Sequence, residues 1–573
     1  MNVREKTQEF VFENINYDSY IVQYDGDIEE DIKNNPEIII TVLNNKFAIL
    51  TVEKNYNIDL AVLKYKSIIY IKPAEMYTLQ QITPVQASQA SFLQVNLPLN
   101  LTGKGVNVAI IDTGIDYLSE EFIDEKGETR IESIWDQSIL SNKEGEVKVV
   151  PFGTLYYKNQ IQDAIKAHRE GKDPYEIVPS RDINGHGTNM AGIIGGGGKN
   201  PELKGVAPKC DFIVVKLIED YSFKAQFNMS IPVYNITVIF AALEFLYKLS
   251  LTDYKPMVIY FPLGSNMWSH RGYGLLDQFI ESISLRSGIA FVTETGNQRV
   301  SREHVSGNIS MVGEISTFEL DISPDQKEIW VDIWVNLPNV ASLSILSPAG
   351  ESTGKINPLI NVTETYNFIF EKTSIKINYF FPEENTGDQL MRIRFYNLQI
   401  GIWTFRLTGE SILDGKYNVW IPQTGIRVGE TRLIPADPYG TITNPGNGRK
   451  VITAAGYNQN NNNLLNYSGM DFKDNYVSAI DVAAGAVNAI TVAPDNEIAV
   501  VNGTSIAAGI VAGTAALLFE WGVVDKNDPF MYSQTIKTYL ARGTEKRSGD
   551  IYPNPQWGYG ILNVLLVFEN IKS

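Results

Sequence analysis

VNGTSIAAGIVAG, residues Val501–Gly513, is a short polar segment that runs directly into a stretch of small apolar residues typical of a buried helix. Ser505 stands at the start of that stretch. Serine is unfavourable inside a helix but favourable at its start, so Ser505 could be a helix cap. It could equally be a nucleophile that faces the positive end of a helix dipole. The choice depends on whether the chain also supplies a base and an acid that orients the base.

The candidate base is a histidine in an unusual setting. The chain has four histidines, and only His186 lies in a glycine-rich context, SRDINGHGTNMAGIIGGGG, where MAGII begins an apolar helix. Glycines on both sides of His186 clear space for a cleft. The other three histidines lie in polar stretches, so we expect solvated surface side chains there: His168, His270 and His304.

The candidate acid follows a buried strand. Asp112 comes after the apolar run VNVAII and before Gly114, at a position that would be the carboxyl edge of a parallel sheet. The alternative is a turn aspartate that caps its own loop. Taken singly, Asp112, His186 and Ser505 each favour the structural interpretation over a catalytic one.

Composition narrows the class of protein. The 573 residues are 44% hydrophobic and 20% charged, which is globular composition and allows two to four domains. The net charge of −18 disfavours general nucleic-acid binding, because an acidic chain repels phosphates. The only cysteine is Cys210, predicted to be a small hydrophobe, so an intrachain disulfide is excluded. We see no secretory signal and expect no membrane span.

The pattern along the chain divides it into four segments. Residues 1–80 read as β-α-β-β-α-β, the ferredoxin-like order. Residues 81–307 alternate strands and helices, which predicts an α/β fold with a parallel sheet. Residues 308–430 form short aromatic and β-branched strands, an all-β insert of jelly-roll or sandwich type. The α/β pattern returns in residues 431–573.

Six motifs together resemble those of the subtilisin-like serine proteases, the subtilases. DTGID, NGHGTNMAG and NGTSIAAGIVAG occur in the subtilase order of acid, histidine and serine, and LKGVAP, FPLGS and TETGN also match segments of that family. The resemblance implies a subtilisin-like catalytic domain in which residues 1–80 are a propeptide. The 74 positions from Asp112 to His186 exceed the spacing of compact subtilases, so we expect an extra surface loop over residues 125–180.

The resemblance also assigns roles. Ser505 would attack the scissile carbonyl, His186 would accept its proton, and Asp112 would orient His186. Asn297 and the Ser505 backbone N–H would bind the oxyanion. Leu263 and Gly264 of FPLGS would pair with the substrate backbone.

Within the subtilases, the chain resembles the clostridial spore germination proteases, the Csp family. Its all-β insert, its lack of a signal peptide and its cysteine-poor acidic composition carry that resemblance. It implies a spore-located hydrolase that cleaves the precursor of the cortex-lytic enzyme during germination. Three alternatives remain: another bacterial subtilase with a β insert, a protease that cuts only itself, and a degenerate subtilase that acts as a signalling scaffold.

The connector YTLQQITPVQASQ, Tyr77–Gln89, is the predicted site of self-cleavage, between Gln80 and Gln81 by family analogy. We expect the released propeptide to stay bound and to inhibit. No cofactor is predicted. Many subtilases bind calcium, but no ligand loop is identifiable, and we expect the loop acids Asp116, Asp124 and Asp182 to be solvated carboxylates. The β insert would brace the catalytic domain or bind a partner.

Overall fold

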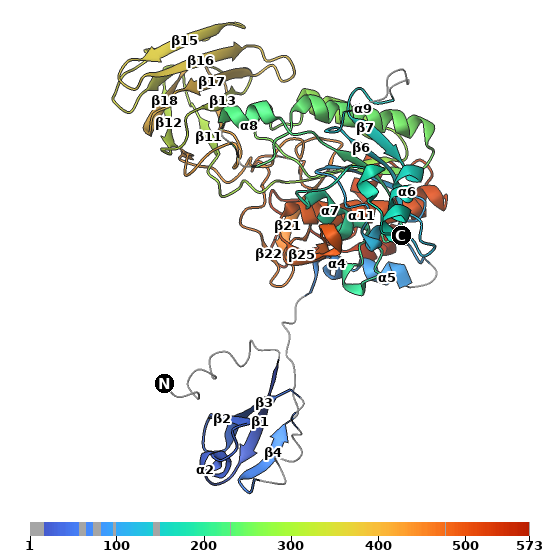
Figure 1. Ribbon diagram of the computed structural model, residues 1–573. Coiled ribbons are helices and arrows are strands. Elements are labelled where there is room, and N and C mark those ends of the chain that lie inside the picture. The colour runs from blue at the N-terminus through green and yellow to red at the C-terminus, as the bar shows by residue number, and fades with distance from the viewer. Residues whose placement is uncertain are drawn as a thin grey trace. The chain divides into compact units, whose positions relative to one another are not determined.

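The computed structural model describes residues 16–54, 56, 65–72, 82–95, 99–140, 149–227, 229, 231–475 and 477–571 (Figure 1). The chain divides into two compact units, Met1–Gln81 and Ile82–Ser573. Each unit has its own hydrophobic core and is described by itself.

The N-terminal unit is a four-stranded antiparallel sheet with strand order β2-β3-β1-β4. Its elements are β1 (Tyr17–Tyr24), α2 (Ile28–Ile32), β2 (Ile38–Val42), β3 (Phe47–Glu53) and β4 (Ile68–Lys72). Asn44 makes the predicted hairpin, because its side chain accepts from the backbone N–H groups of Lys46 and Phe47. The second predicted helix falls largely on residues 57–64, outside the described residues.

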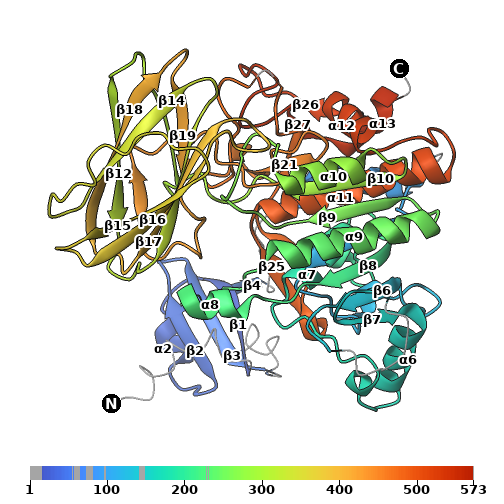
Figure 2. The same ribbon diagram turned by 90° about the horizontal axis from the view of Figure 1, so that it is seen from above.

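The second unit is built on an 11-stranded sheet, whose main path runs β26-β27-β23-β21-β10-β9-β5-β8-β6-β7 with β22 beside β21 (Figure 2). The sheet is parallel from β27 to β6, as the alternating pattern predicted. Its strands are β5 (Asn107–Asp112), β6 (Ile131–Asp136), β7 (Thr154–Tyr157), β8 (Asp211–Lys216), β9 (Met257–Phe261), β10 (Ile289–Glu294), β21 (Ile452–Asn458), β22 (Asn463–Leu464), β23 (Val482–Gly485), β26 (Thr544–Glu545) and β27 (Ile561–Leu562).

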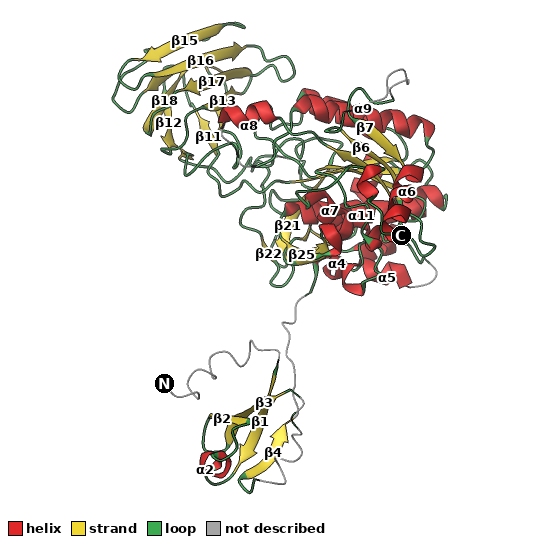
Figure 3. Ribbon diagram, viewed as in Figure 1, coloured by secondary structure: helices red, strands yellow, loops and turns green. Residues whose placement is uncertain are grey.

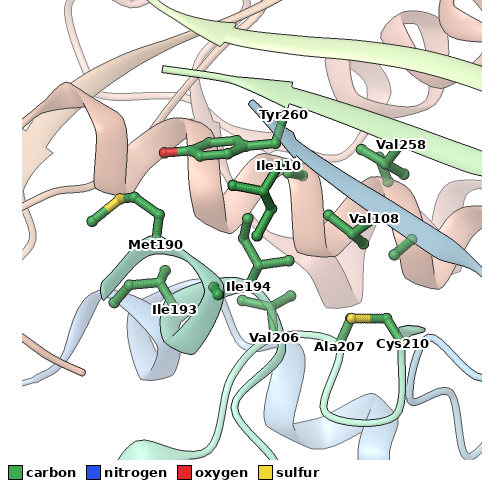
Figure 4. Close-up of a cluster of buried hydrophobic side chains, with 14 of the residues drawn as sticks. Val108, Ile110, Met190, Ile193, Ile194, Val206, Ala207, Cys210, Val258 and Tyr260 are labelled. Atoms are coloured by element: carbon green, nitrogen blue, oxygen red, sulfur yellow. The ribbon is translucent and has the colours of Figure 1, made fainter. Parts of the chain in front are cut away.

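Helices cover both faces of this sheet because its strands are apolar on both sides. Val108 and Ile110 of β5 pack in the cluster shown in Figure 4, which α7 and α11 complete, whereas Ala109 and Ile111 pack toward α9 and α10. The helices are α4 (Pro84–Ala87), α5 (Ala90–Val95), α6 (Lys158–Arg169), α7 (His186–Gly195), α8 (Tyr221–Phe227), α9 (Ile236–Thr252), α10 (Leu275–Ser284), α11 (Thr504–Phe519), α12 (Ser533–Arg542) and α13 (Val564–Ile571). A small hairpin, β24 (Ala489–Val492) and β25 (Ile498–Val501), precedes α11.

The opening stretch of sequence forms α11, the central helix of the core, and every residue of α11 is buried. The helical segment Thr504–Val524 is long and apolar enough to cross a membrane by length and composition. Because 89% of its most apolar window is buried inside the protein, its apolarity is that of a core helix.

The predicted surface loop over residues 125–180 is wrong in its described part. That region contributes β6 to the parallel sheet, β7 antiparallel to β6, and helix α6. Ile161, Ala164 and Ile165 bury one side of α6. The extra length is therefore ordered structure with its own apolar face.

The insert is an antiparallel sandwich (Figure 3). A six-stranded sheet, β11-β19-β13-β17-β16-β15, packs on a four-stranded sheet, β14-β18-β12-β20, around one core. Its strands are β11 (His304–Asn308), β12 (Ile315–Ile322), β13 (Ile329–Val335), β14 (Val340–Leu346), β15 (Thr363–Phe368), β16 (Thr373–Phe380), β17 (Gln389–Tyr396), β18 (Gly401–Ser411), β19 (Lys416–Trp420) and β20 (Arg432–Ile434).

Two histidines predicted to be on the surface are instead buried where the sandwich meets the α/β part. The rings of His270 and His304 stack on the two faces of Trp420, with centroids 4.1 and 4.6 Å from it. Burial lowers the pKa of both, that of His270 to about 4. The prediction failed because the residues around these histidines are polar, which does not indicate that their flat rings stack on Trp420. His168 is exposed on α6, as predicted.

Candidate active site

The parallel strands bring the acid and the histidine together at one edge of the sheet. Asp112 is the last residue of β5 and is fully buried, and His186 is the first residue of α7. Nδ1 of His186 lies 2.8 Å from Oδ2 and 2.9 Å from Oδ1 of Asp112. A Cβ at position 187 would lie 2.1 Å from the Gly114 carbonyl oxygen, so only glycine lets the start of α7 approach the turn after β5 this closely.

A second aspartate fixes the loop that carries the histidine. Asp182 is 4% exposed and accepts four hydrogen bonds, from Thr113 Oγ1, Gly185 N, Thr188 N and Thr188 Oγ1. The expectation of a solvated carboxylate is therefore wrong at Asp182. It is also wrong at Asp116, which is 8% exposed and accepts from two backbone N–H groups. Asp124 is partly exposed.

The environment of His186 favours its protonated form. Burial lowers the pKa of His186, but the charge and hydrogen bond of Asp112 outweigh that effect and raise the pKa to about 9. The side chain remains 35% exposed, so its ring can still be reached from the solvent.

Ser505 is the second residue of α11 and is 9% exposed. Tyr260 of β9 donates to its backbone carbonyl at 2.8 Å, which ties the start of α11 to the sheet. Among the described residues, the hydrogen-bond partner of Ser505 Oγ is Oε2 of Glu294, at 2.8 Å, and not the His186 ring. The structure thus brings Ser505 to the same edge as Asp112 and His186 but turns its hydroxyl toward a buried acid.

Asn297 lies in the turn after β10, with its side chain exposed. Its Oδ1 accepts from Thr504 N at 3.2 Å and lies 2.9 Å from Thr504 Oγ1. The carboxamide oxygen is therefore engaged by the first residue of α11, and the carboxamide nitrogen lies near Gly503, 3.9 Å from where a Cβ at that position would be.

The segment after β9 holds the predicted substrate-pairing residues. Leu263 is partly buried and Gly264 is exposed. A side chain at Gly264 would collide with Thr443, whose Oγ1 would lie 2.1 Å from the added Cβ. Gln423, just beyond β19 of the sandwich, donates to the Gly264 carbonyl and accepts from Asn266 N, both at 3.1 Å. The insert therefore braces this segment.

Two predicted features cannot be placed. Gln80 and Gln81 lie outside the described residues. Within the described ranges, the structure holds no group of three or more His, Cys, Asp or Glu side chains placed to bind a metal ion.

Sequence reasoning missed three residues of this edge: Glu294, Thr504 and Gln423. Glu294 lies in the motif TETGN and Thr504 in NGTSIAAGIVAG, but the sequence analysis assigned neither residue a role. The signal for Glu294 was available, because an acid at the end of the apolar run IAFVT is as unusual as Asp112 at the end of VNVAII. Nothing in the sequence brings Gln423 to residues more than 150 positions away.

One sheet edge thus carries an acid–histidine pair, a serine at a helix start and an exposed carboxamide, which are the kinds of group that acyl transfer uses. The subtilase family model matches residues 103–360 and 436–560, and the chain belongs to this family. It is a serine endopeptidase of the subtilisin type.

The solved structure of the CspB protease of Clostridium perfringens is similar to this chain, with 31% sequence identity and a TM-score of 0.75. The match covers 85% of this chain and 97% of that one. A cold-adapted subtilisin-like serine proteinase also matches, with 14% identity, a TM-score of 0.39, and 83% and 97% of the two chains covered. No curated protein matches the chain.

Proposed function

We propose that this chain is a spore germination protease that removes its own N-terminal unit and then activates a cortex-lytic enzyme precursor by proteolysis. The similarity to CspB over almost the full length of that protease carries this proposal. The Asp112–His186 pair and Ser505 at the start of α11 provide the chemistry.

In the proposed reaction, Ser505 Oγ first turns from Glu294 to Nε2 of His186. Oγ then attacks the scissile carbonyl carbon while Nε2 takes its proton, and Asp112 stabilises the imidazolium through Nδ1. The carbonyl oxygen becomes an oxyanion, which accepts from the Asn297 amide and the Ser505 backbone N–H. His186 returns the proton to the leaving amine. Water then attacks the acyl-enzyme by the same steps and frees Ser505.

The proposed partners are the chain's own residues 1–80 and a protein precursor, and the proposed location is the spore. These follow from the family resemblance and from the similarity to CspB. Self-cleavage between Gln80 and Gln81 would separate the compact units Met1–Gln81 and Ile82–Ser573, one residue before their boundary.

The test compares purified wild type with Ser505→Ala by intact mass and N-terminal sequencing. We expect a cut near Gln80-Gln81 in the wild type and an uncut variant. The processed wild type, but not Ser505→Ala, should then cleave a purified cortex-lytic enzyme precursor at one site. Self-cleavage without cleavage of the precursor would favour the inhibited scaffold or a different substrate, and two uncut chains would contradict the proposed protease.

A further inference from the structure

Glu294 is a buried acid in contact with the nucleophile, and the reaction described above gives it no role. It ends β10 and is 6% exposed. Its Oε2 lies 2.8 Å from Ser505 Oγ and 2.8 Å from Thr504 Oγ1. Thr504 Oγ1 lies in turn 2.9 Å from Asn297 Oδ1. Three oxygen–oxygen contacts therefore connect Ser505 to Asn297.

Each of these contacts requires one proton between its two oxygens, because two oxygens at such a distance repel each other without one. The hydroxyls of Ser505 and Thr504 supply two protons. The Asn297 carboxamide supplies none, since its oxygen is fixed toward α11 by the N–H of Thr504. An ionised Glu294 would leave one contact without a proton.

A proton on Glu294 Oε2 fills the third contact, and only one direction then satisfies all three. With that proton in place, Thr504 would donate to Asn297, Ser505 would donate to Glu294, and the protonated Glu294 would donate to Thr504 across the 2.8 Å contact between Oε2 and Oγ1. The surroundings agree with this assignment, because burial raises the pKa of Glu294. The hydrogen bonds of Ser505 and Thr504 and the charge of His186 lower that pKa, but burial outweighs them.

The groups that face Glu294 come from three neighbouring elements besides α11. They are His186 at the start of α7, Asp112 at the end of β5, and the Tyr260 hydroxyl on β9. The negative charge of Asp112 disfavours a second negative charge on Glu294 and so raises the pKa of Glu294. A neutral Glu294 also adds no negative charge beside the predicted oxyanion position at Asn297.

We propose that Glu294 is a positioning residue which, as a neutral carboxylic acid, holds the Ser505 hydroxyl away from His186 in the resting enzyme and, through Thr504, orients Asn297. This inference rests on the proposed function and deepens it. When a substrate carbonyl arrives, Ser505 transfers its hydrogen bond from Glu294 to His186, and Glu294 keeps its own proton.

The test uses inactivation of the full chain by diisopropyl fluorophosphate, which reports the reactivity of Ser505 without a protein substrate. The variant is Glu294→Gln, which is neutral and of the same shape. Its NH₂ group can donate to both hydroxyls, which frees the Ser505 proton for His186. Glu520→Gln, a buried acid at the other end of α11, is the matched control, and Ser505→Ala is the blank.

We expect Glu294→Gln to react about two- to tenfold faster than the wild type, the effect of releasing one hydrogen bond. The pH at which the rate is half-maximal should not move, because a neutral group replaces a neutral group near His186. Glu520→Gln should match the wild type in both respects. The infrared difference spectrum between the wild type and Glu294→Gln should show the carbonyl band of a protonated carboxylic acid.

Three results would overturn the inference: an unchanged or slower rate in Glu294→Gln, a half-maximal pH shifted downward, or a carboxylate band in the difference spectrum. The downward shift would mean that wild-type Glu294 carries a charge that raises the pKa of His186. If the probe labels neither the wild type nor Glu294→Gln, the proposed protease itself fails and this inference fails with it. If the probe labels Ser505 in the wild type and Glu294→Gln is labelled at the same rate, the inference fails but the proposed protease stands.

Discussion

The carboxylate of Asp112 determines how tightly His186 holds its proton. It is buried, bonded to Nδ1, and is the main cause of a His186 pKa near 9. A general base works only when it is neutral, so kcat/KM of the free enzyme should rise with pH as His186 loses its proton, through about pH 9.

Asp112→Asn should therefore change two quantities at once. The pKa of His186 should fall because its negative partner is gone, so the acid limb of the kcat/KM profile moves to lower pH. The maximal rate should fall by about 10⁴-fold, since the orienting acid is lost. The measurement is kcat/KM for peptide hydrolysis, determined from about pH 5 to about pH 10 in steps of roughly one pH unit.

His168→Gln is the control for this prediction, because His168 is an exposed histidine on α6 and should leave the profile unchanged. An acid limb that stays in place in Asp112→Asn would mean that another group controls the titration.

At the scale of elements, Gln423 links the sandwich to the predicted substrate-pairing segment. Gln423 holds the Gly264 carbonyl and Asn266 N of the segment after β9. If that segment pairs with the substrate backbone, Gln423→Ala should raise KM for extended peptides about two- to tenfold, the effect of losing its hydrogen bonds, with little change in kcat.

The control for Gln423→Ala is a substrate rather than a variant. A single-residue ester does not extend along Leu263 and Gly264, so its KM should stay the same. An equal rise of KM for the ester and the peptide would point to a general distortion of the site instead.

Trp420 packs where the sandwich meets the α/β part, and it is 4% exposed and stacked with the rings of His270 and His304. Trp420→Ala removes a large buried side chain and should lower the free energy of unfolding by about 3–5 kcal/mol. Phe370→Ala is the matched control in the same sandwich, because Phe370 is 75% exposed and should change stability by less than about 0.5 kcal/mol. Urea unfolding in the Ser505→Ala background measures both without self-digestion. Equal effects of the two substitutions would show that the stack does not hold the parts together.

At the scale of the whole molecule, the N-terminal unit is a compact unit with its own core around Val22, Ala48 and Leu50. A unit of this kind can keep its fold after the chain is cut behind it. We therefore predict that residues 1–80 stay bound to the processed enzyme and inhibit it.

Size-exclusion chromatography of the processed wild type should show both pieces in one peak. Mild urea that releases the small piece should raise peptide hydrolysis before the catalytic unit unfolds. Separate elution of the two pieces in plain buffer, with full activity, would contradict retention of the N-terminal unit.

The catalytic sheet is also assembled at this scale. β10 pairs in parallel with β21 although the whole sandwich lies between them in the chain. The α/β pattern on both sides of the insert predicted this interruption, because apolar strands with no partner of their own must join one sheet.

The sequence by itself determined the parallel α/β fold, the antiparallel insert and the three residues that the motifs single out. The fold follows from local rules, because hydrophobic periodicity marks strands and helices. Asp112, His186 and Ser505 were singled out by the resemblance of their motifs to those of the subtilases. The buried histidines, the ordered region over residues 125–180, the brace of Gln423 and the contact of Glu294 with Ser505 were decided only by the tertiary structure. Each depends on which distant residues surround a side chain, and burial, proton sharing and stacking are properties of those surroundings and not of the local sequence.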